Sequence, residues 1–565
     1  MSALVCRCGH ISRHWRSPSE SCNEWKFRSS TTDAANCLVT CVTSFALWAS
    51  YHIFQYLPQK GTLPAGFRVE RSRSGMKLFW ITLAAGLFLR LCILHAVSGA
   101  TEVPFVRAAP THSQTDPAIA FIEAPIVTAN GLTKRFPQGS RLVRMTPGAQ
   151  AASVLPLTPE FYAASDPQVS FDGTRILFSA QRTKSALWQI WEMAVDGTGL
   201  QQITHCTGDC LQPKYLPQNQ IVYTSVDGKG AHRTSTIYIC QISGKSAHPI
   251  TFGPGNFQVE TVLHSGRVVV SAESPLLPGG NLHRSRTLFT LRPDGSGLTL
   301  LRDQAMPNQN RSGAIELADG TILFLQTKNV AGNSAGGQLA SIRPGALRAS
   351  VLTGPAAAYQ SAQELRVATL VVARHGSAPA SDKNFNLYTF DLAGKSLGDV
   401  LYRNAKASSV QAVPLTPHAL PRIYWSILHP IVQTGRILCL DSYISQDAPN
   451  GRLIGRIASV RVVTLEQPGN RERIVGDAPV ESDGSFYATV PADAPIRFEL
   501  LGPKGKILHA QRSWIWVRNG EDRGCQGCHD SPALAPANHF PMALRRFNTP
   551  TLLGGELRAQ QSGRP

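Results

Sequence analysis

The sequence predicts a mostly β protein, in which a six-bladed β-propeller is followed by a small β-sandwich and a short C-terminal segment. A pattern of short apolar strands and tight turns recurs between about residues 160 and 430, and its spacing of roughly 46 to 54 residues is typical of propeller blades. Beyond it, residues 433–518 alternate apolar and polar side chains between turns, as sandwich strands do. We therefore expect two β domains in succession.

A secretory signal begins at Met76 rather than at residue 1. Lys77 precedes an apolar run over residues 78–89, and residues 98–100 are the small residues Ser-Gly-Ala. A basic start, an apolar stretch and a small-residue cleavage site are the three parts of a signal peptide. We expect residues 76–100 to be removed, which places the rest of the protein in the periplasm or another exported location.

The signal has two consequences for the N-terminal region. Residues 1–75 are predicted to be an extension that results from a misassigned start. Alternatively, residues 78–97 form an uncleaved membrane anchor. Arg90 argues against this, because a charged side chain is costly inside the membrane. Any membrane association would come through this anchor.

The chain is moderately basic, with a formal net charge of +18. The charge is diffuse and no nucleic-acid-binding motif accompanies it, so we expect no nucleic-acid partner. The charge suits an acidic partner or a membrane surface better. We expect a redox partner protein or a complex of the cell envelope as the partner.

The propeller is predicted over residues 118–432. Five copies of the repeat are clear, and each supplies about four strands, the content of one blade. A sixth copy, around residues 405–445, is degenerate, and residues 118–147 are expected to add a strand that closes the ring. The predicted hairpin turns need positive φ and recur at Gly173, Asn219, Gly266 and Gly320.

Four cysteines of the predicted β domains have structural interpretations. Cys206 and Cys210 are close enough in sequence to form a local disulfide in an oxidising compartment, although the spacing alone leaves the bond open. Cys240 and Cys439 lie in apolar strands and are predicted to be small buried side chains.

The segment "GCQGCH" contains a C-x-x-C-H motif, the clearest candidate for a functional site in this sequence. Covalent haem attachment needs two neighbouring thiols and an axial ligand, and C-x-x-C-H supplies them. Cys525 and Cys528 would form the thioethers of one haem c, and His529 would be the proximal iron ligand. A disulfide or half of a zinc site is the alternative, but zinc needs a second ligand pair. A thioredoxin-like site would need a βαβ context, which the sequence does not predict.

The motif begins a predicted haem-binding tail, residues 519–565. Only 36 residues follow His529, too few for an independent cytochrome fold, so a haem would pack against the sandwich, the propeller or a partner. His539 and Met542 are candidates for the distal iron ligand, in that order. Each could equally be an ordinary surface or packing residue.

Two resemblances add to these predictions. The run from Pro167 to Ser179, with its "SFDG" and "ILFS", resembles the WD40-like repeats of TolB propellers. The whole exported chain resembles the hydrazine synthase alpha subunit family, through "DGSFYATVPADAPIRFELLGPKGK", "RSWIWVRNGEDRGCQGCH" and "PMALRR" in that order. In that comparison we assigned the family's middle domain to the propeller.

The family resemblance implies an exported, haem-bearing, redox-active protein. Hydrazine synthase alpha itself carries two c-type haems, whereas this chain has one C-x-x-C-H, so we do not expect a two-centre hydrazine-forming mechanism. Only Cys525, Cys528 and His529 are carried over. The function predicted is electron transfer or small-molecule redox chemistry, with no catalytic residue identified. The alternative is a non-catalytic, TolB-like propeller that serves as a binding scaffold of the cell envelope.

Overall fold

The computed structural model describes 116–125, 136–146, 153–228, 233–273, 286–301, 309–328, 336–343, 345–346, 348–355, 358–375, 384–445, 448–466, 471–511, 513–527, 540–545 and 551–553. All of these residues belong to one compact unit, His112–Pro565. The predicted extension (1–75) and signal peptide (76–100) lie outside the described residues. In the part of the chain that is described, no helix has the length and apolar character needed to cross a membrane.

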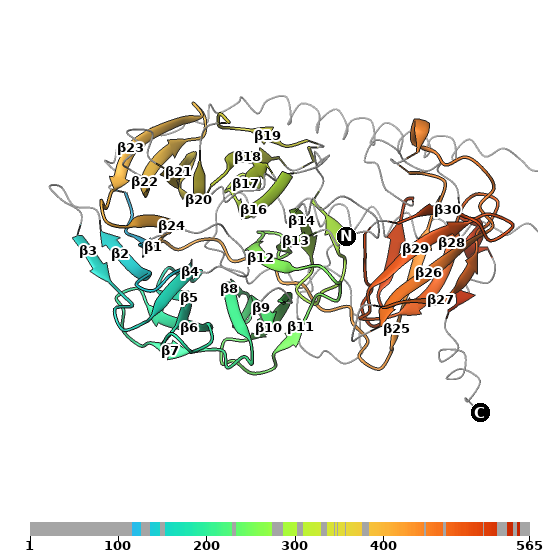
Figure 1. The fold of residues 1–565 in the computed structure, drawn as a ribbon, viewed down its shortest axis with the longest axis horizontal. Coiled ribbons are helices and arrows are strands. Elements are labelled where there is room, and N and C mark those ends of the chain that lie inside the picture. The colour runs from blue at the N-terminus through green and yellow to red at the C-terminus, as the bar shows by residue number, and fades with distance from the viewer. Residues whose placement is uncertain are drawn as a thin grey trace, which may run out of the picture. The chain divides into compact units, whose positions relative to one another are not determined.

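Five four-stranded antiparallel sheets follow one another along the chain and form five blades (Figure 1). Blade 1 contains β4 (Ala163–Val169), β5 (Arg175–Gln181), β6 (Gln189–Ala194) and β7 (Gln201–Gln202). Blade 2 contains β8 (Asp209–Leu216), β9 (Gln220–Asp227), β10 (Thr234–Gln241) and β11 (His248–Pro249). Blade 3 contains β12 (Phe257–Val262), β13 (Val268–Glu273), β14 (Arg286–Leu291) and β15 (Thr299–Leu300). Blade 4 contains β16 (Gln309–Glu316), β17 (Ile322–Lys328), β18 (Gln338–Ile342) and β19 (Ser350–Val351). Blade 5 contains β20 (Tyr359–Arg366), β21 (Thr369–His375), β22 (Phe385–Asp391) and β23 (Ser396–Tyr402).

The sixth blade is assembled from both ends of the propeller, and the six-bladed prediction is confirmed. Its sheet has the order β24-β1-β2-β3. The strands are β1 (Ile119–Ala124), β2 (Arg141–Thr146), β3 (Ser153–Pro156) and β24 (Ser408–Pro414). The N-terminal region thus supplies three strands instead of the single one expected. The degenerate sixth copy supplies only β24, because the next strand along the chain belongs to the sandwich.

The first hairpin of each repeated blade turns at a residue with positive φ. Gly173, Asn219, Gly266 and Gly320 have φ values of 75°, 55°, 82° and 80°. The fifth copy has Ala368 at the corresponding turn, with φ 62°. The recurring position predicted from the sequence is therefore a left-handed turn in all five blades.

The inner strands are linked across blade boundaries. The Asp166 carboxylate in β4 accepts hydrogen bonds from the Gln212 backbone N–H in β8 (3.2 Å) and the Gln411 amide in β24 (3.1 Å). The Gln411 carbonyl oxygen in turn accepts the Asp166 backbone N–H at 2.9 Å. One buried side chain thus joins blade 1 to blade 2 and to the closing blade.

The sandwich consists of two four-stranded sheets, ordered β27-β26-β29-β30 and β31-β25-β28-β32. The first contains β26 (Ser459–Glu466), β27 (Arg471–Pro479), β29 (Ile496–Leu501) and β30 (Ile507–Ala510). The second contains β25 (Thr434–Cys439), β28 (Phe486–Pro491), β31 (Asp522–Cys525) and β32 (Thr551–Leu552). Short 3-10 helices occur at Pro449–Gly451 (η2) and Met542–Leu544 (η3).

The eight strands exceed the five or so that the sequence indicated. The additional ones include β31 and β32, which come from the segment expected to be a separate haem-binding tail. Both pair in parallel with strands of the sandwich, β31 with β25 and β32 with β28. The segment that contains the C-x-x-C-H motif is thus partly built into the sandwich.

Candidate functional site

Cys525 is the last residue of β31, an edge strand of the sandwich. The ladder pairs Arg436 with Asp522 at one end and Cys439 with Cys525 at the other. The Arg436 guanidinium forms an ion pair with the Asp522 carboxylate, but both side chains are about half exposed, so this pair stabilises little. The backbone ladder, rather than the ion pair, fixes the position of Cys525.

A loop of the sandwich holds the start of the motif. The Leu440 N–H donates to the Cys525 carbonyl oxygen at 2.9 Å, and the Asp441 N–H donates to that of Gln526 at 3.2 Å. A Cβ at Gly527 would lie 2.7 Å from both the Cβ and the carbonyl oxygen of Ile444. The chain can approach the loop this closely only because residue 527 is glycine.

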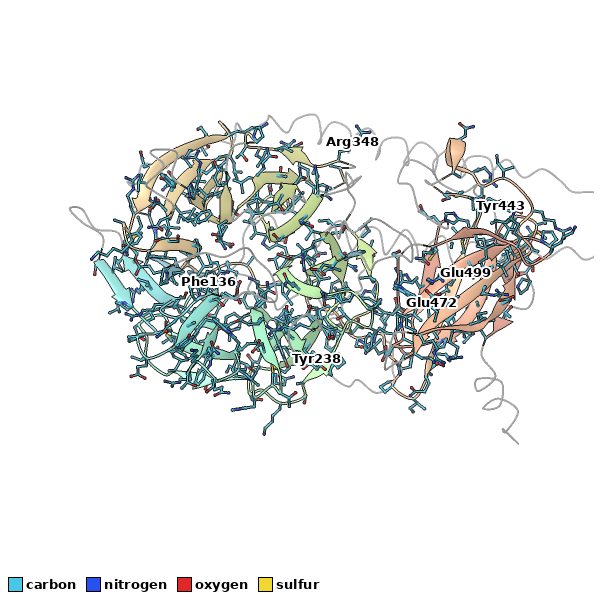
Figure 2. The ribbon with its side chains drawn as sticks, viewed as in Figure 1. Phe136, Tyr238, Arg348, Tyr443, Glu472 and Glu499 are labelled. Carbon is cyan, nitrogen blue, oxygen red and sulfur yellow. A yellow bond between two sulfur atoms is a disulfide. The ribbon has the colours of Figure 1, made fainter. Side chains whose placement is uncertain are left out.

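The same loop is polar and internally bonded. Asp441, 6% exposed, accepts the Arg452 guanidinium at 2.7 Å and the Tyr443 N–H at 3.0 Å. The Arg452 guanidinium lies 5.6 Å from the centre of the Tyr443 ring, and the Tyr443 hydroxyl accepts the Ile457 N–H at 3.0 Å. Figure 2 labels Tyr443 among the side chains of the sandwich. These contacts make the loop beside the motif a rigid support.

Met542 is fixed on a neighbouring turn of the sandwich. Its N–H donates to the Asp483 carboxylate at 2.8 Å, and its sulfur lies 3.2 Å from the Ser482 hydroxyl. The turn contacts the loop beside the motif, since the Ser442 N–H donates to the Gly484 carbonyl oxygen at 2.8 Å. The structure therefore places Met542 and Cys525 against the same loop region.

Three predicted site residues lie outside the described residues, namely Cys528, His529 and His539. Their predicted roles remain predictions. Within the described residues, no group of three or more His, Cys, Asp or Glu side chains could hold a metal ion.

The segment just before the motif joins the sandwich to blade 3. Trp516, 1% exposed, belongs to the apolar core of blades 2 and 3, and its indole N–H donates to the Gly295 carbonyl oxygen at 3.1 Å. The Phe257 ring meets the indole edge-on at 5.6 Å between centroids. Trp516 is therefore a core residue of the propeller that the sandwich contributes.

Charged side chains reinforce this connection. Arg518 donates to the Asp294 carbonyl oxygen and, at 2.6 Å, to the Asp493 carboxylate. Glu521 accepts the Gly297 N–H at 2.9 Å and the Arg518 N–H at 2.8 Å. Burial raises the pKa of the Asp493 carboxyl, and the neighbouring Arg518 charge partly offsets this. We had not predicted this interface, although the run "WIWVR" before the motif is an apolar signal that could have indicated it.

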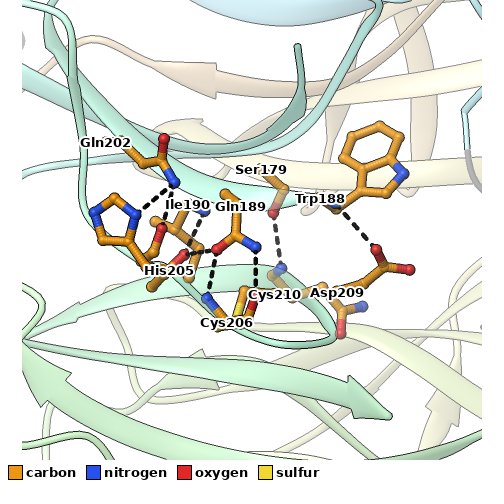
Figure 3. Close-up of a disulfide and its surroundings, with 11 residues drawn as sticks. Ser179, Trp188, Gln189, Ile190, Gln202, His205, Cys206, Asp209 and Cys210 are labelled. Carbon is orange, nitrogen blue, oxygen red and sulfur yellow. Dashed lines mark hydrogen bonds between the residues drawn. A yellow bond between two sulfur atoms is a disulfide. The ribbon is translucent and has the colours of Figure 1, made fainter. Parts of the chain in front are cut away.

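Cys206, in the connection before β8, forms a disulfide with Cys210, in β8 (Figure 3). The Gln189 side chain in β6 accepts the Cys206 N–H at 2.9 Å and donates to its carbonyl oxygen at 3.1 Å. The disulfide that the spacing left open is therefore present and tied to blade 1. Cys240 and Cys439 are buried, 1% and 2% exposed, as expected; burial raises the pKa of the Cys240 thiol to about 12.

Comparisons with known proteins concern both domains. A family model, the hydrazine synthase alpha subunit middle domain, matches residues 440–530. This match falls on the sandwich and the motif rather than on the propeller, to which we had assigned that domain. The chain is 23% identical over 520 residues to hydrazine synthase subunit alpha of Kuenenia stuttgartiensis, covering 70% of this chain and 63% of that one. It therefore spans less than two thirds of its relative's length.

Solved structures extend the comparison. The Kuenenia stuttgartiensis hydrazine synthase structure aligns with a TM-score of 0.65 and 19% identity, covering 76% of this chain and 71% of that chain. TolB from Acinetobacter baumannii aligns with a TM-score of 0.38 and 13% identity, covering 52% and 66%. The second score is low, so the propeller assignment rests on the sheet order described above. By sequence and by fold, this chain is a distant homologue of the hydrazine synthase alpha subunit.

Proposed function

We propose that this protein is an exported, c-type cytochrome-like redox protein with one covalent haem. The observation that carries the proposal is the placement of Cys525, at the end of an edge strand and within the region that matches the hydrazine synthase alpha middle domain. The disulfide between Cys206 and Cys210 supports export, because disulfides persist in oxidising compartments.

The described part of the motif fits haem attachment. Cys525 packs against the sandwich core but remains partly exposed at the end of an edge strand, so its side chain lies at the border of the sheet. Cys525 and Cys528 would hold the haem by thioethers, and His529 would bind the iron. A haem held in this way supplies one-electron transfer. The chain itself supplies the rigid loop against which the first half of the motif is bonded.

The distal ligand decides between electron transfer and small-molecule chemistry. A His or Met on the sixth position excludes a substrate, whereas an open position admits one. We keep His539 as the first candidate and Met542 as the second. Met542 would have to exchange its contact with the Ser482 hydroxyl for the iron.

The first prediction tests the haem itself. We expect the full chain, produced in cells competent in cytochrome c maturation, to keep haem on a denaturing gel. The double variant Cys525→Ser/Cys528→Ser should lose this covalent haem, because no thioether can form. His529→Ala should keep some covalent haem but change the spin state seen in the absorption spectrum.

Carbon monoxide binding to the reduced protein then separates the two redox roles. Slow or absent binding in the wild type, with fast binding in His539→Ala or Met542→Ala, would identify the distal ligand and favour electron transfer. Fast stoichiometric binding in the wild type would favour an open site. A wild-type protein without haem on the gel would contradict the proposal.

The second candidate function is a propeller scaffold of the cell envelope, with partner binding as its role. One observation favours it. The connection from β24 to β25 exposes large apolar side chains, among them Leu420 (59%), Trp425 (80%) and Ile431 (96%). Exposed apolar side chains that gather in one segment are typical of protein-binding surfaces. A haem-free protein that still co-purifies with an envelope partner, and loses it on Trp425→Ser, would support this candidate.

A further inference from the structure

Cys439 is a third thiol at the motif, directly opposite Cys525. The two residues are paired across the parallel strands β25 and β31. Neighbouring strands lie about 4.7 to 4.9 Å apart, and a disulfide needs Cα atoms about 4.4 to 6.8 Å apart. Directly paired residues of a parallel ladder project from the same face of the sheet, so both sulfurs lie on the inner side of the sandwich.

Packing and exposure give the two thiols different roles. Cys439 is 2% exposed and belongs to the core of the sandwich, and Cys525 packs against the same core while remaining partly exposed. The pair also ends the ladder, since β25 and β31 both stop at these residues. Just beyond this pair, the Leu440 and Asp441 N–H groups donate to the carbonyl oxygens of Cys525 and Gln526, so the two cysteines are held side by side.

We propose that Cys439 and Cys525 form a thiol–disulfide exchange site, whose substrate is a disulfide of low molecular mass or of an oxidoreductase. The partly exposed Cys525 attacks, as its thiolate, one sulfur of the external disulfide and releases one thiol. The buried Cys439 then attacks the sulfur of Cys525 in this mixed disulfide and releases the second thiol. The protein loses two protons and two electrons, and the external disulfide gains them.

This inference concerns the chain before any haem is attached, because a thioether at Cys525 would leave no thiol there, and it does not depend on the proposed haem. An internal disulfide would nevertheless withhold the Cys525 sulfur from thioether formation. Reduction of the Cys439–Cys525 bond would then be a required step before attachment. Cys528 is the competing partner for Cys525, and the experiment must remove it.

The test uses the full chain with Cys528→Ser, produced in cells without cytochrome c maturation, so that no haem enters. The folded protein is treated with oxidised glutathione, its remaining thiols are blocked, and it is digested with trypsin without reduction. Cleavage after Arg436, Arg452, Arg523 and Arg545 yields peptides 437–452 and 524–545, which carry Cys439 and Cys525. We expect these two peptides to be recovered joined, and to separate on reduction.

The digest contains its own controls. The Cys206–Cys210 bond stays within one tryptic peptide and reports that disulfides survive the procedure. Cys240, on β10 in blade 2, should be recovered as an unmodified thiol after unfolding. Cys439→Ala in the same background should leave Cys525 joined to glutathione instead.

Two outcomes would overturn the inference. One is a Cys525–glutathione adduct that persists in the presence of Cys439; the other is quantitative recovery of Cys439 as a thiol under conditions that oxidise Cys525. Haem staining of the wild type from maturation-competent cells is a separate measurement, so a failure there would leave this result standing.

Discussion

Cys240 and Cys439 show how position changes the chemistry of one residue type. Both are buried in β-strands. Cys240 on β10 is paired with Ile221 on β9, and burial raises the pKa of its thiol to about 12. Cys439 is paired with another cysteine. The thiolate is the reactive form of cysteine, so Cys240, which stays protonated, behaves as an apolar side chain. Cys439, by contrast, lies opposite a second cysteine with which it can form a disulfide.

We predict that Cys240 resists iodoacetamide at pH 8 in the folded protein and reacts after unfolding in guanidinium. The raised pKa of Cys240 also makes the stability of the folded protein depend on pH. Between about pH 9 and about pH 12 the unfolded chain loses the thiol proton while the folded chain keeps it, so this residue lowers the free energy of unfolding as the pH rises. Cys240→Ala should show a smaller loss over that window, measured as urea midpoints. An equal loss in both proteins would count against the assigned pKa.

At the scale of single elements, the blade hairpins reuse one turn geometry with different residues. Gly, Asn and Ala occupy the same left-handed position. Glycine takes this conformation without a steric cost, whereas a residue with a Cβ loses roughly 1 to 2 kcal/mol there. Ala368, between β20 and β21, is the position at which the sequence conflicts most plainly with the turn.

We predict that Ala368→Gly stabilises the protein by about 1 kcal/mol, because it removes this conflict at an exposed turn. The matched control is Gly320→Ala at the equivalent turn of blade 4, which should destabilise by a similar amount. Chemical denaturation of both variants checks the pair. If both substitutions changed the free energy of unfolding in the same direction, the positive φ of the turn would not be the cause of the stability changes.

These elements also show what the sequence could predict. Blades 1 to 5 were predictable because each hairpin is local and carries its own turn signal. The closing blade was only partly predictable, because β24 pairs with β1 across almost the whole propeller. Strands β31 and β32 have four and two residues, too short for a periodic pattern, so only tertiary pairing defines them. The motif was visible in the sequence, but the thiol opposite Cys525 was not.

At the scale of the whole molecule, Trp516 makes the propeller and the sandwich interdependent. The indole contributes to the core of blades 2 and 3, while the residues on either side belong to the sandwich region. Trp516 is buried in a core that it shares with Phe257. The two domains therefore cannot separate without exposing apolar surface of both to water. The motif is nine residues further along the chain.

We predict that Trp516→Ala destabilises the protein by about 3 to 5 kcal/mol, the usual loss for a large buried aromatic side chain. We expect calorimetry to show one coupled transition of propeller and sandwich for the wild type and two separate transitions for the variant. Trp425→Ala is the matched control, because that indole is 80% exposed and its loss should change little. A single unshifted transition in Trp516→Ala would contradict the coupling.

The composition of the closing blade has a consequence for the order in which the protein can fold. During synthesis, β1, β2 and β3 emerge long before β24. The pairing of β1 with β24, for example of Ala120 with Val413, can form only after β24 has been made. Contacts of such sequence separation form slowly, because the entropy of closing a long loop opposes them. Until then the inner edge of β1 is an open template for another strand. The two hydrogen bonds between Asp166 and Gln411 would then form only when the ring closes. The Asp166 backbone N–H, which donates to the Gln411 side chain, should therefore be among the last to gain protection from hydrogen exchange during refolding.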